Sequence, residues 1–103
     1  MDIQLIPIEP DQMRQPPAED LGFCVHFANR MFTQRYSKGR GWHNARLEPY
    51  GPFQLNPATM IFHYAQLIFE GLKAYRRADG HINLFRPMEN MRRFNNSARR
   101  MAM

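Results

Sequence analysis

The chain has few of the residues that stabilise secreted proteins, span membranes or attack substrates covalently. Its single cysteine, Cys24, excludes an internal disulfide and fits a reducing compartment. Its apolar stretches are far shorter than a membrane span, and no signal-peptide pattern is present. These absences predict a cytoplasmic protein that does not insert into membranes.

Serine, lysine and histidine offer little reactive chemistry. Neither Ser37 nor Ser97 lies in a nucleophile-elbow pattern, so acyl transfer is not expected. Lys38 falls in a predicted loop and Lys73 in a predicted strand, and nothing near them in the sequence marks either as a Schiff-base nucleophile. The four histidines show no zinc-ligand spacing, so no metal site is predicted.

Arginine is what the chain has in excess, with a formal net charge of +5. Such a charge is compatible with binding nucleic acid, with binding anionic metabolites, or with an acidic remainder of a longer chain. The 103 residues, 44% of them apolar, predict one domain with a modest core. No glycine, asparagine or proline ends the helical pattern that runs into RRMAM, so we expect the chain to be part of a longer one.

The first half of the chain predicts strands and loops. Prolines in residues 1–20 indicate an extended N-terminal arm, and residues 21–103 are expected to form the domain. The aromatic alternation of residues 21–36 predicts a strand that begins near Phe27. Residues 37–41 then predict a turn, and the chain crosses from it over 42–47.

The second half predicts a short helix, a hairpin and a longer helix. Asn56 as N-cap and Pro57 at the first helical position predict a helix through about Phe62. Residues 71–77 and 81–85 alternate as strands do, and Asp79-Gly80 between them favours a tight turn. Pro87 predicts the start of the last helix, whose apolar stripe is Met91, Phe94, Ala98 and Met101. The elements together predict an α+β fold with mostly antiparallel strands and flanking helices.

Two groups of residues could carry a binding function. Arg93 lies in the second turn of the last helix, where its planar guanidinium could hold a phosphate near the hairpin. The alternative is that the arginines of this helix simply form a solvated face. Tyr64 and Phe69 flank a short turn and could wall an apolar pocket, although aromatic side chains more often belong to an ordinary core.

Three long stretches resemble one enzyme family. They are GWHNARLEPYGPFQLNPA, HYAQLIFEGLKAYRRADGHINLFRP, and the helix spacing FRPxxNxxRxxxSxxR that ends at Arg100. From about Leu21 to its end, the chain resembles the N-terminal domain of branched-chain amino-acid aminotransferases. These are pyridoxal-phosphate enzymes of fold type IV. The resemblance implies an incomplete small α+β domain, truncated before the larger domain.

The resemblance also implies roles for individual residues. Arg93 is similar to the family's ligand for the cofactor phosphate, and Tyr64, Phe69 and Phe23 resemble residues that line the pocket for a branched side chain. The implied reaction moves the amino group of L-leucine, L-isoleucine or L-valine to 2-oxoglutarate, in biosynthesis or degradation of these amino acids. The implied assembly is a homodimer or a larger homo-oligomer. The family's aldimine lysine lies in the larger domain, so no catalytic residue is expected here and the segment alone should be inactive.

The chain departs from the family pattern at a few positions. One branch of the family reads FGxxFTDHM where this chain has Cys24 in place of the glycine and Ala28, Asn29 and Arg30 in place of the Thr-Asp-His run. The family's HYGQ is HYAQ here, with Ala65. These changes could mark a divergent subgroup.

Two other functions compete with this interpretation. Another fold type IV enzyme, such as a D-amino-acid aminotransferase or an aminodeoxychorismate lyase, would use the same cofactor. A nucleic-acid-binding module would instead use Arg92, Arg93, Arg99 and Arg100 against phosphates, with salt-sensitive affinity. It would favour aromatic residues among those arginines, where the chain offers only Phe94.

Overall fold

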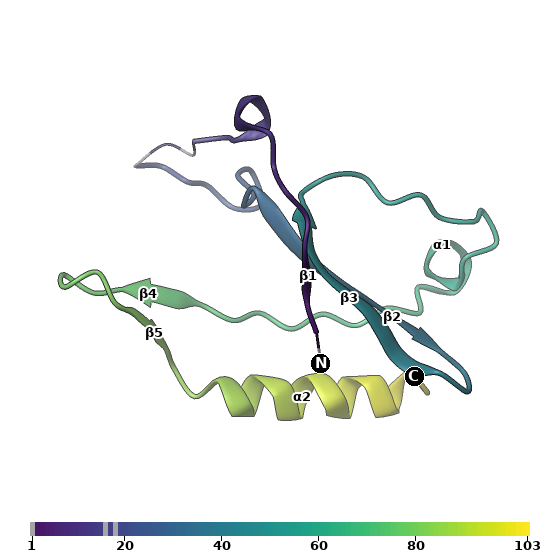
Figure 1. The fold of residues 1–103 in the computed structure, drawn as a ribbon. Helices are drawn as coiled ribbons and strands as arrows, with labels where there is room; N and C mark the ends of the chain where they lie inside the picture. Colours follow the sequence, from purple (N-terminus) through teal and green to yellow (C-terminus); the bar gives the residue numbers. More distant parts are fainter. Residues whose placement is uncertain (1, 16, 18) are drawn as a thin grey trace. The chain divides into compact units, whose positions relative to one another are not determined.

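The computed structural model describes residues 2–15, 17 and 19–103 of the chain, which divides into two compact units. One unit is Met1–Gln54 and the other is Leu55–Met103. In the described residues, short strands, two α-helices and one 3₁₀ turn make up the secondary structure (Figure 1), which confirms the predicted α+β class. The division into an arm of residues 1–20 and a domain of 21–103 stays a prediction.

A three-stranded sheet of order β1-β3-β2 organises the first unit. Strands β2 (Arg30–Ser37) and β3 (Gly41–Pro49) pair antiparallel, and Thr33 lies opposite Arg46. The turn between them is closed by a 3.1 Å hydrogen bond from Arg40 N–H to the Ser37 carbonyl, as the sequence predicted. A register shift after Thr33 shows that one strand carries an irregularity.

Part of the predicted arm belongs to this sheet. Strand β1 (Gln4–Leu5) pairs parallel with β3, and Ile6 N–H donates to the Leu47 carbonyl at 3.0 Å. The chain is extended there, as expected, but its backbone groups are satisfied by an edge of the sheet rather than by solvent. The following prolines lead into a 3₁₀ turn at Pro10–Gln12, and Pro16 lies outside the described residues.

Strand β2 begins three residues later than predicted. Phe27 stays outside the strand and stacks on Tyr50, with ring centroids 4.9 Å apart. Tyr50 N–H donates to the Asn29 carbonyl at 2.9 Å, and the Asn29 side chain exchanges two hydrogen bonds with the backbone of Arg14. The Asn29 side chain therefore links its own loop to the loop that contains Arg14, in a region where the sequence alone suggested a strand.

The second unit contains the predicted hairpin. Strands β4 (Ala74–Arg76) and β5 (Ile82–Leu84) pair antiparallel, with Tyr75 opposite Asn83. Gly80 has φ +85° and donates its N–H to the Arg77 carbonyl at 3.0 Å. This is the conformation for which the Asp79-Gly80 pair was expected to be needed.

Helix α1 (Met60–Tyr64) starts later than predicted, with Thr59 rather than Asn56 at the N-cap position. The side chain of Asn56 instead accepts the Ala58 N–H at 2.8 Å, and its carbonyl accepts the Thr59 N–H at 2.9 Å. These bonds form a turn, and the extended backbone of Thr59 (ψ 130°) separates it from the helix. Asparagine is favoured in both places for the same local bond, which is why the sequence pattern misplaced the helix start.

Helix α2 (Pro87–Arg100) begins at Pro87, as the sequence predicted. It ends at Arg100 without a glycine, where Ala102 takes a left-handed φ of 55° and Met103 N–H donates to the Ala98 carbonyl at 2.9 Å. In this structure an alanine thus supplies, after Arg100, the left-handed residue that glycine usually supplies at a helix end. No described helix is long and apolar enough to cross a membrane.

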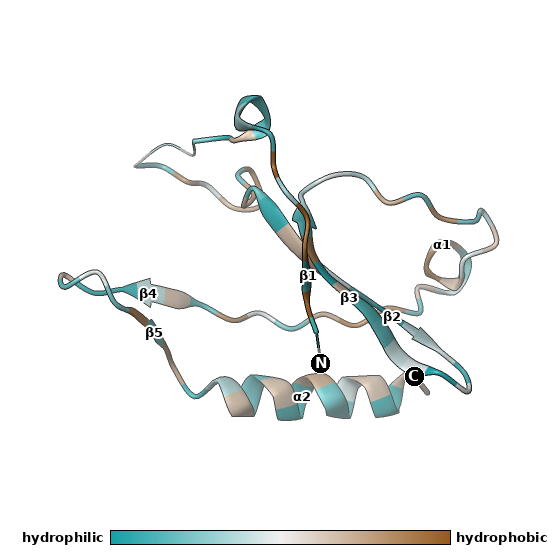
Figure 2. Ribbon diagram, viewed as in Figure 1, coloured by the Kyte–Doolittle hydropathy of each residue, from teal (hydrophilic) through white to brown (hydrophobic). Residues whose placement is uncertain are grey.

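The expected modest core is not formed by the described residues. Ala45 in the middle of β3 is their one buried hydrophobic residue, at 5% exposure. Apolar residues occur in both units, for example in β1 and β5 (Figure 2), yet most of their large side chains are exposed. A three-stranded sheet and a two-stranded hairpin offer too little facing surface to bury them.

Candidate functional site

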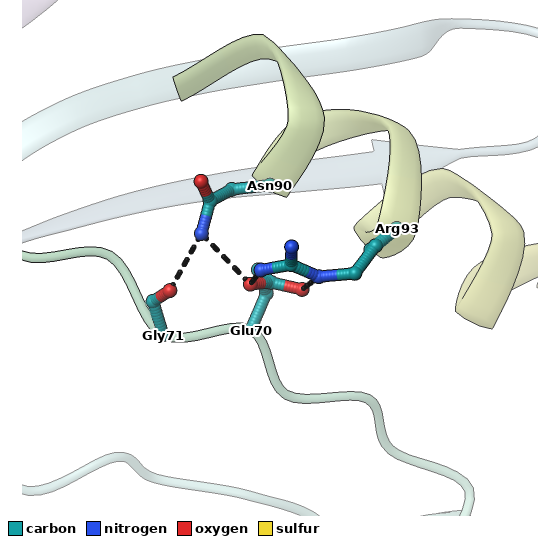
Figure 3. Close-up of polar contacts among 4 residues, drawn as sticks. All are labelled: Glu70, Gly71, Asn90 and Arg93. Atoms are coloured by element: carbon teal, nitrogen blue, oxygen red, sulfur yellow. Dashed lines mark hydrogen bonds and ion pairs between the residues drawn. The ribbon is translucent and has the colours of Figure 1, made fainter. Parts of the chain in front are cut away.

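The candidate site lies between helix α2 and the loop that precedes the hairpin. Asn90 and Arg93 are three residues apart on α2, so their side chains share one face of the helix. That face meets Glu70 and Gly71 of the loop (Figure 3). The helix thus brings two polar side chains to one carboxylate twenty residues earlier in the chain.

Arg93 and Glu70 form a two-point ion pair. The Arg93 Nε–H donates to Glu70 Oε2 at 3.1 Å, and the Nη2 group donates to Glu70 Oε1. Parallel bonds of this kind fix the plane of the guanidinium. The third nitrogen, Nη1, points away from Glu70 (Figure 3) and donates to no described residue. Arg93 therefore keeps one edge available.

Asn90 holds the carboxylate in place from the same helix. Its Nδ2 group donates to Glu70 Oε1 at 2.9 Å and to the Gly71 carbonyl at 2.7 Å. The Glu70 side chain is only 12% exposed, whereas that of Arg93 is 60% exposed. Glu70 is the sheltered member of the pair, and Arg93 reaches from it toward solvent.

The pair shifts both ionisation equilibria toward the charged forms. The hydrogen bond from Arg93 lowers the pKa of Glu70, more than partial burial raises it, and the bond from Asn90 lowers it further. The hydrogen bond and the negative charge of Glu70 raise the pKa of Arg93. Both groups are therefore charged at neutral pH.

The neighbouring arginine has a different partner. Arg92 pairs with Glu89 at 2.7 Å, and Arg86 lies 3.7 Å from the same carboxylate. All three residues lie at or near the first turns of α2, and the two arginines are largely exposed whereas the Glu89 side chain is 40% exposed. The structure thus separates Arg93, which is anchored to the loop, from Arg92, which is paired within its own helix.

Tyr64 and Phe69 lie on either side of a turn in the second unit, but both are exposed. Tyr64 is the last residue of α1, with 73% of its surface exposed, and Phe69 precedes Glu70 with 85% exposed. Phe69 lines an open groove of about 480 Å³ with residues that include Ser97 and Arg100 of α2. No described ring contact joins Tyr64 to Phe69. Within this unit the two aromatics border open surface and do not enclose a pocket.

Phe23 belongs to the first unit and is the most exposed of the predicted site residues. It lies in a turn that spans Gly22 to Val25, and 92% of its surface is exposed. Its role as a pocket residue stays a prediction, as do those of Arg93, Tyr64 and Phe69.

Sequence reasoning did not identify Glu70 or Asn90 as site residues. Both occur inside the quoted motifs, but neither was given a role. The sequence did contain a hint of this contact. Asn90 and Arg93 share a helical face and both carry N–H donors, and Glu70 is the acidic residue just before the hairpin. Only the fold shows that Glu70 lies within hydrogen-bonding distance of Asn90 and Arg93.

No family model matches the chain, but the curated proteins similar to it in sequence include several of one kind. It is 56% identical over 82 residues to a probable branched-chain-amino-acid aminotransferase of Streptomyces coelicolor, which covers 80% of this chain and 23% of that protein. It is 48% identical over 89 residues to the branched-chain-amino-acid transaminase 1 of Bacillus subtilis, covering 86% and 25%. A Mycobacterium tuberculosis branched-chain-amino-acid aminotransferase is 48% identical over 93 residues, covering 90% and 25%.

The chain is homologous to branched-chain-amino-acid aminotransferases. The resemblance drawn from the three motifs is therefore confirmed. The chain spans about a quarter of the length of these curated aminotransferases. The region that matches includes most of the chain, so the homology is not confined to one short motif.

Proposed function

We propose that the full-length protein containing this chain is a pyridoxal-phosphate-dependent branched-chain-amino-acid transaminase. It would transfer the amino group of L-leucine, L-isoleucine or L-valine to 2-oxoglutarate, in the cytoplasm and as a homodimer or larger homo-oligomer. The observation that carries the proposal is 48–56% identity to branched-chain aminotransferases over most of the chain. In this proposal the chain supplies a phosphate anchor and part of a substrate pocket.

The donor chemistry of Arg93 suits the cofactor's phosphate. Arginine presents planar N–H groups that match phosphate oxygens, and it stays charged at all physiological pH values. Arg93 is 60% exposed and offers its Nη1 group while Glu70 accepts from Nε and Nη2. When bound, the cofactor supplies the electron sink for amino transfer, and the protein supplies orientation and electrostatics.

Phe69 and Tyr64 suit one side of an apolar pocket. A branched hydrocarbon side chain offers no hydrogen-bonding group, so selection depends on apolar contact and on the desolvation cost of charged competitors. Both aromatics are exposed in this unit, and further residues from the full-length protein or from a second subunit would have to close the pocket. A role for Phe23 in the substrate pocket is proposed from its resemblance to a family residue alone.

The catalytic lysine is proposed to lie outside residues 1–103. Lys38 lies in the turn between β2 and β3, and Lys73 precedes β4, and both are exposed. Neither has the sheltered setting that activates a lysine nucleophile. A polypeptide of residues 1–103 is therefore expected to be inactive, and transamination of leucine by that polypeptide would contradict this part of the proposal.

The test is the amino-donor specificity of the full-length protein. Purified protein is assayed with pyridoxal phosphate and 2-oxoglutarate, with L-leucine, L-isoleucine, L-valine or D-alanine as amino donor. Formation of glutamate with the three L-amino acids supports the proposal. Preference for D-alanine, or no amino transfer to 2-oxoglutarate from any donor, would overturn it in favour of another fold type IV enzyme.

A further inference from the structure

The ion pair between Glu70 and Arg93 divides the guanidinium into two edges. Arginine has five N–H donors, one on Nε and two on each terminal nitrogen. Glu70 accepts from Nε and from Nη2, which uses one of the two parallel donor pairs. The other parallel pair consists of an N–H of Nη1, which points away from the carboxylate (Figure 3), and the second N–H of Nη2. It can bind two oxygens of one phosphate.

Glu70 is itself fixed more firmly than a surface carboxylate. It is 12% exposed, and Asn90 ties its Oε1 atom to the Gly71 carbonyl through one amide group. Arg93 has several rotatable bonds and is 60% exposed, so without a partner its side chain would sample many rotamers. The carboxylate therefore removes freedom that an anion would otherwise have to remove on binding.

The same carboxylate has an opposing electrostatic effect. A negative charge beside Arg93 reduces the attraction of the guanidinium for a phosphate dianion. The two effects predict opposite changes in phosphate affinity when Glu70 is replaced by glutamine, which has nearly the same size but no charge. Loss of positioning would weaken phosphate binding, and loss of the negative charge would strengthen it. Because Arg93 is largely exposed, solvent screens the charge effect, and the geometric effect is expected to dominate.

We propose that Glu70, held by Asn90, is a positioning residue that orients Arg93 so that its outer edge binds the phosphate of the cofactor. This inference rests on the proposed function, in which Arg93 is the phosphate ligand. Glu70 touches neither cofactor nor substrate and acts through Arg93. It orients the guanidinium before the phosphate binds.

The experiment compares pyridoxal phosphate with pyridoxal, which lacks the phosphate. Both are titrated into the cofactor-free full-length protein and its Glu70→Gln variant, and binding is followed by absorbance. Glutamine can accept from only one of the two Arg93 nitrogens, because its amide nitrogen is a donor. We expect the variant to bind pyridoxal phosphate about threefold to tenfold more weakly, the effect of leaving one long side chain unfixed, and to bind pyridoxal unchanged.

Three further variants make the result specific. Glu89→Gln removes one negative charge from α2, the helix that carries Arg93. Glu89 acts on Arg93 through its charge and forms its ion pairs with Arg86 and Arg92, so this variant measures the charge effect alone and should leave both affinities nearly unchanged. Arg93→Lys should weaken binding of pyridoxal phosphate, and Glu70→Gln added to it should have little further effect. If Arg93→Lys leaves binding of pyridoxal phosphate unchanged, the phosphate role of Arg93 fails, and the inference fails with it.

Other outcomes overturn the inference while the role of Arg93 stands. Tighter binding of pyridoxal phosphate by Glu70→Gln would show that charge outweighs positioning. Equal loss of affinity for pyridoxal phosphate and pyridoxal would show a general structural defect. Additive effects of Glu70→Gln and Arg93→Lys would show that Glu70 does not act through Arg93.

Discussion

Cys24 and Ala65 share a left-handed backbone conformation, with φ values of 56° and 48°. They lie in different units, Cys24 in a turn and Ala65 at the end of α1. The family pattern that the chain resembles has glycine at position 65, and one branch of the family also has glycine at position 24. Glycine adopts this conformation freely, whereas a residue with a Cβ atom pays about 1–2 kcal/mol. The chain therefore has a left-handed backbone at two positions that do not carry the residue best suited to it.

The first prediction is that restoring glycine at Ala65 stabilises the protein. Ala65→Gly should raise the free energy of unfolding of the full-length protein by about 1 kcal/mol, because relief of the left-handed conformation exceeds the added entropy of the unfolded chain. Urea unfolding measures the change. Ala98→Gly is the matched control inside α2, and it should lower the same free energy by about 1 kcal/mol.

Cys24→Gly should change stability in the same direction as Ala65→Gly, because Cys24 has the same sign of φ. A loss of stability in both variants would contradict the conformational explanation. It would indicate that the two side chains make contacts in the full-length protein that outweigh the backbone cost.

The second prediction concerns two glycines that both have room for a Cβ atom but differ in backbone conformation. A Cβ atom added to Gly80 or to Gly51 would have no neighbour within 4 Å, but only Gly80 has a positive φ, of +85°. Gly80→Ala should therefore destabilise the protein by about 1 kcal/mol through backbone strain in the hairpin turn. Gly51→Ala should have no effect or stabilise slightly.

Urea unfolding of the two variants checks this prediction. Equal effects at Gly80 and Gly51 would show that the hairpin turn does not hold its left-handed conformation in solution. The comparison needs no assumption about function.

Local signals explain how much of the fold the sequence predicted. The hairpin around Gly80 and the start of α2 at Pro87 were predicted correctly, because each depends on the conformational preference of one residue. The start of α1 was misplaced because Asn56 forms a turn with the same type of bond that caps a helix. The pairing of Gln4–Leu5 with β3 was missed because it joins residues about forty positions apart, and no local pattern encodes such a partner.

The sequence predicted one member of the candidate site, Arg93, but not its partner Glu70. Arg93 was selected by resemblance, since its spacing alone did not distinguish it from Arg92. Glu70 was missed, because its approach to α2 depends on the path of the loop and the hairpin between them. Sequence patterns indicate which side chains share a helix face, and the fold decides which partner they meet.

The third prediction concerns the pH dependence of stability. The bond from Arg93 lowers the pKa of Glu70 below its ordinary value of 4.5. The unfolded chain therefore takes up a proton first as the pH falls, and the stabilisation is complete above about 4.5 and is lost as the pH falls through the folded-state pKa. Wild type should have a higher Tm than Glu70→Gln at pH 7, and the difference should shrink below pH 4.5.

Thermal unfolding of both proteins between neutral and acid pH measures this difference. Glu89→Gln is the control, because Glu89 pairs with Arg86 and Arg92 on the exposed surface of α2. A Tm difference between wild type and Glu70→Gln that persists unchanged at acid pH would show that it does not arise from ionisation of Glu70.

The fourth prediction tests Phe69 as a wall of the proposed side-chain pocket. Phe69 is 85% exposed in its unit and lines an open groove, so removing its ring should cost little stability there. If the ring contacts a branched side chain in the full-length enzyme, Phe69→Ala should raise the KM for L-leucine by about tenfold, in the range that loss of one apolar contact produces. The KM for L-alanine, whose methyl group is too short to reach the ring, should change little.

Steady-state kinetics of the full-length enzyme with the two amino donors checks the ratio of these effects. Phe53→Ala is the matched control, because Phe53 is also exposed, at 66%, and has no proposed role in the site. A parallel rise in KM for leucine and alanine would contradict a pocket role, because it would show loss of a contact common to both substrates. Since only the side chain distinguishes leucine from alanine, a selective effect on leucine would place the ring of Phe69 against that side chain.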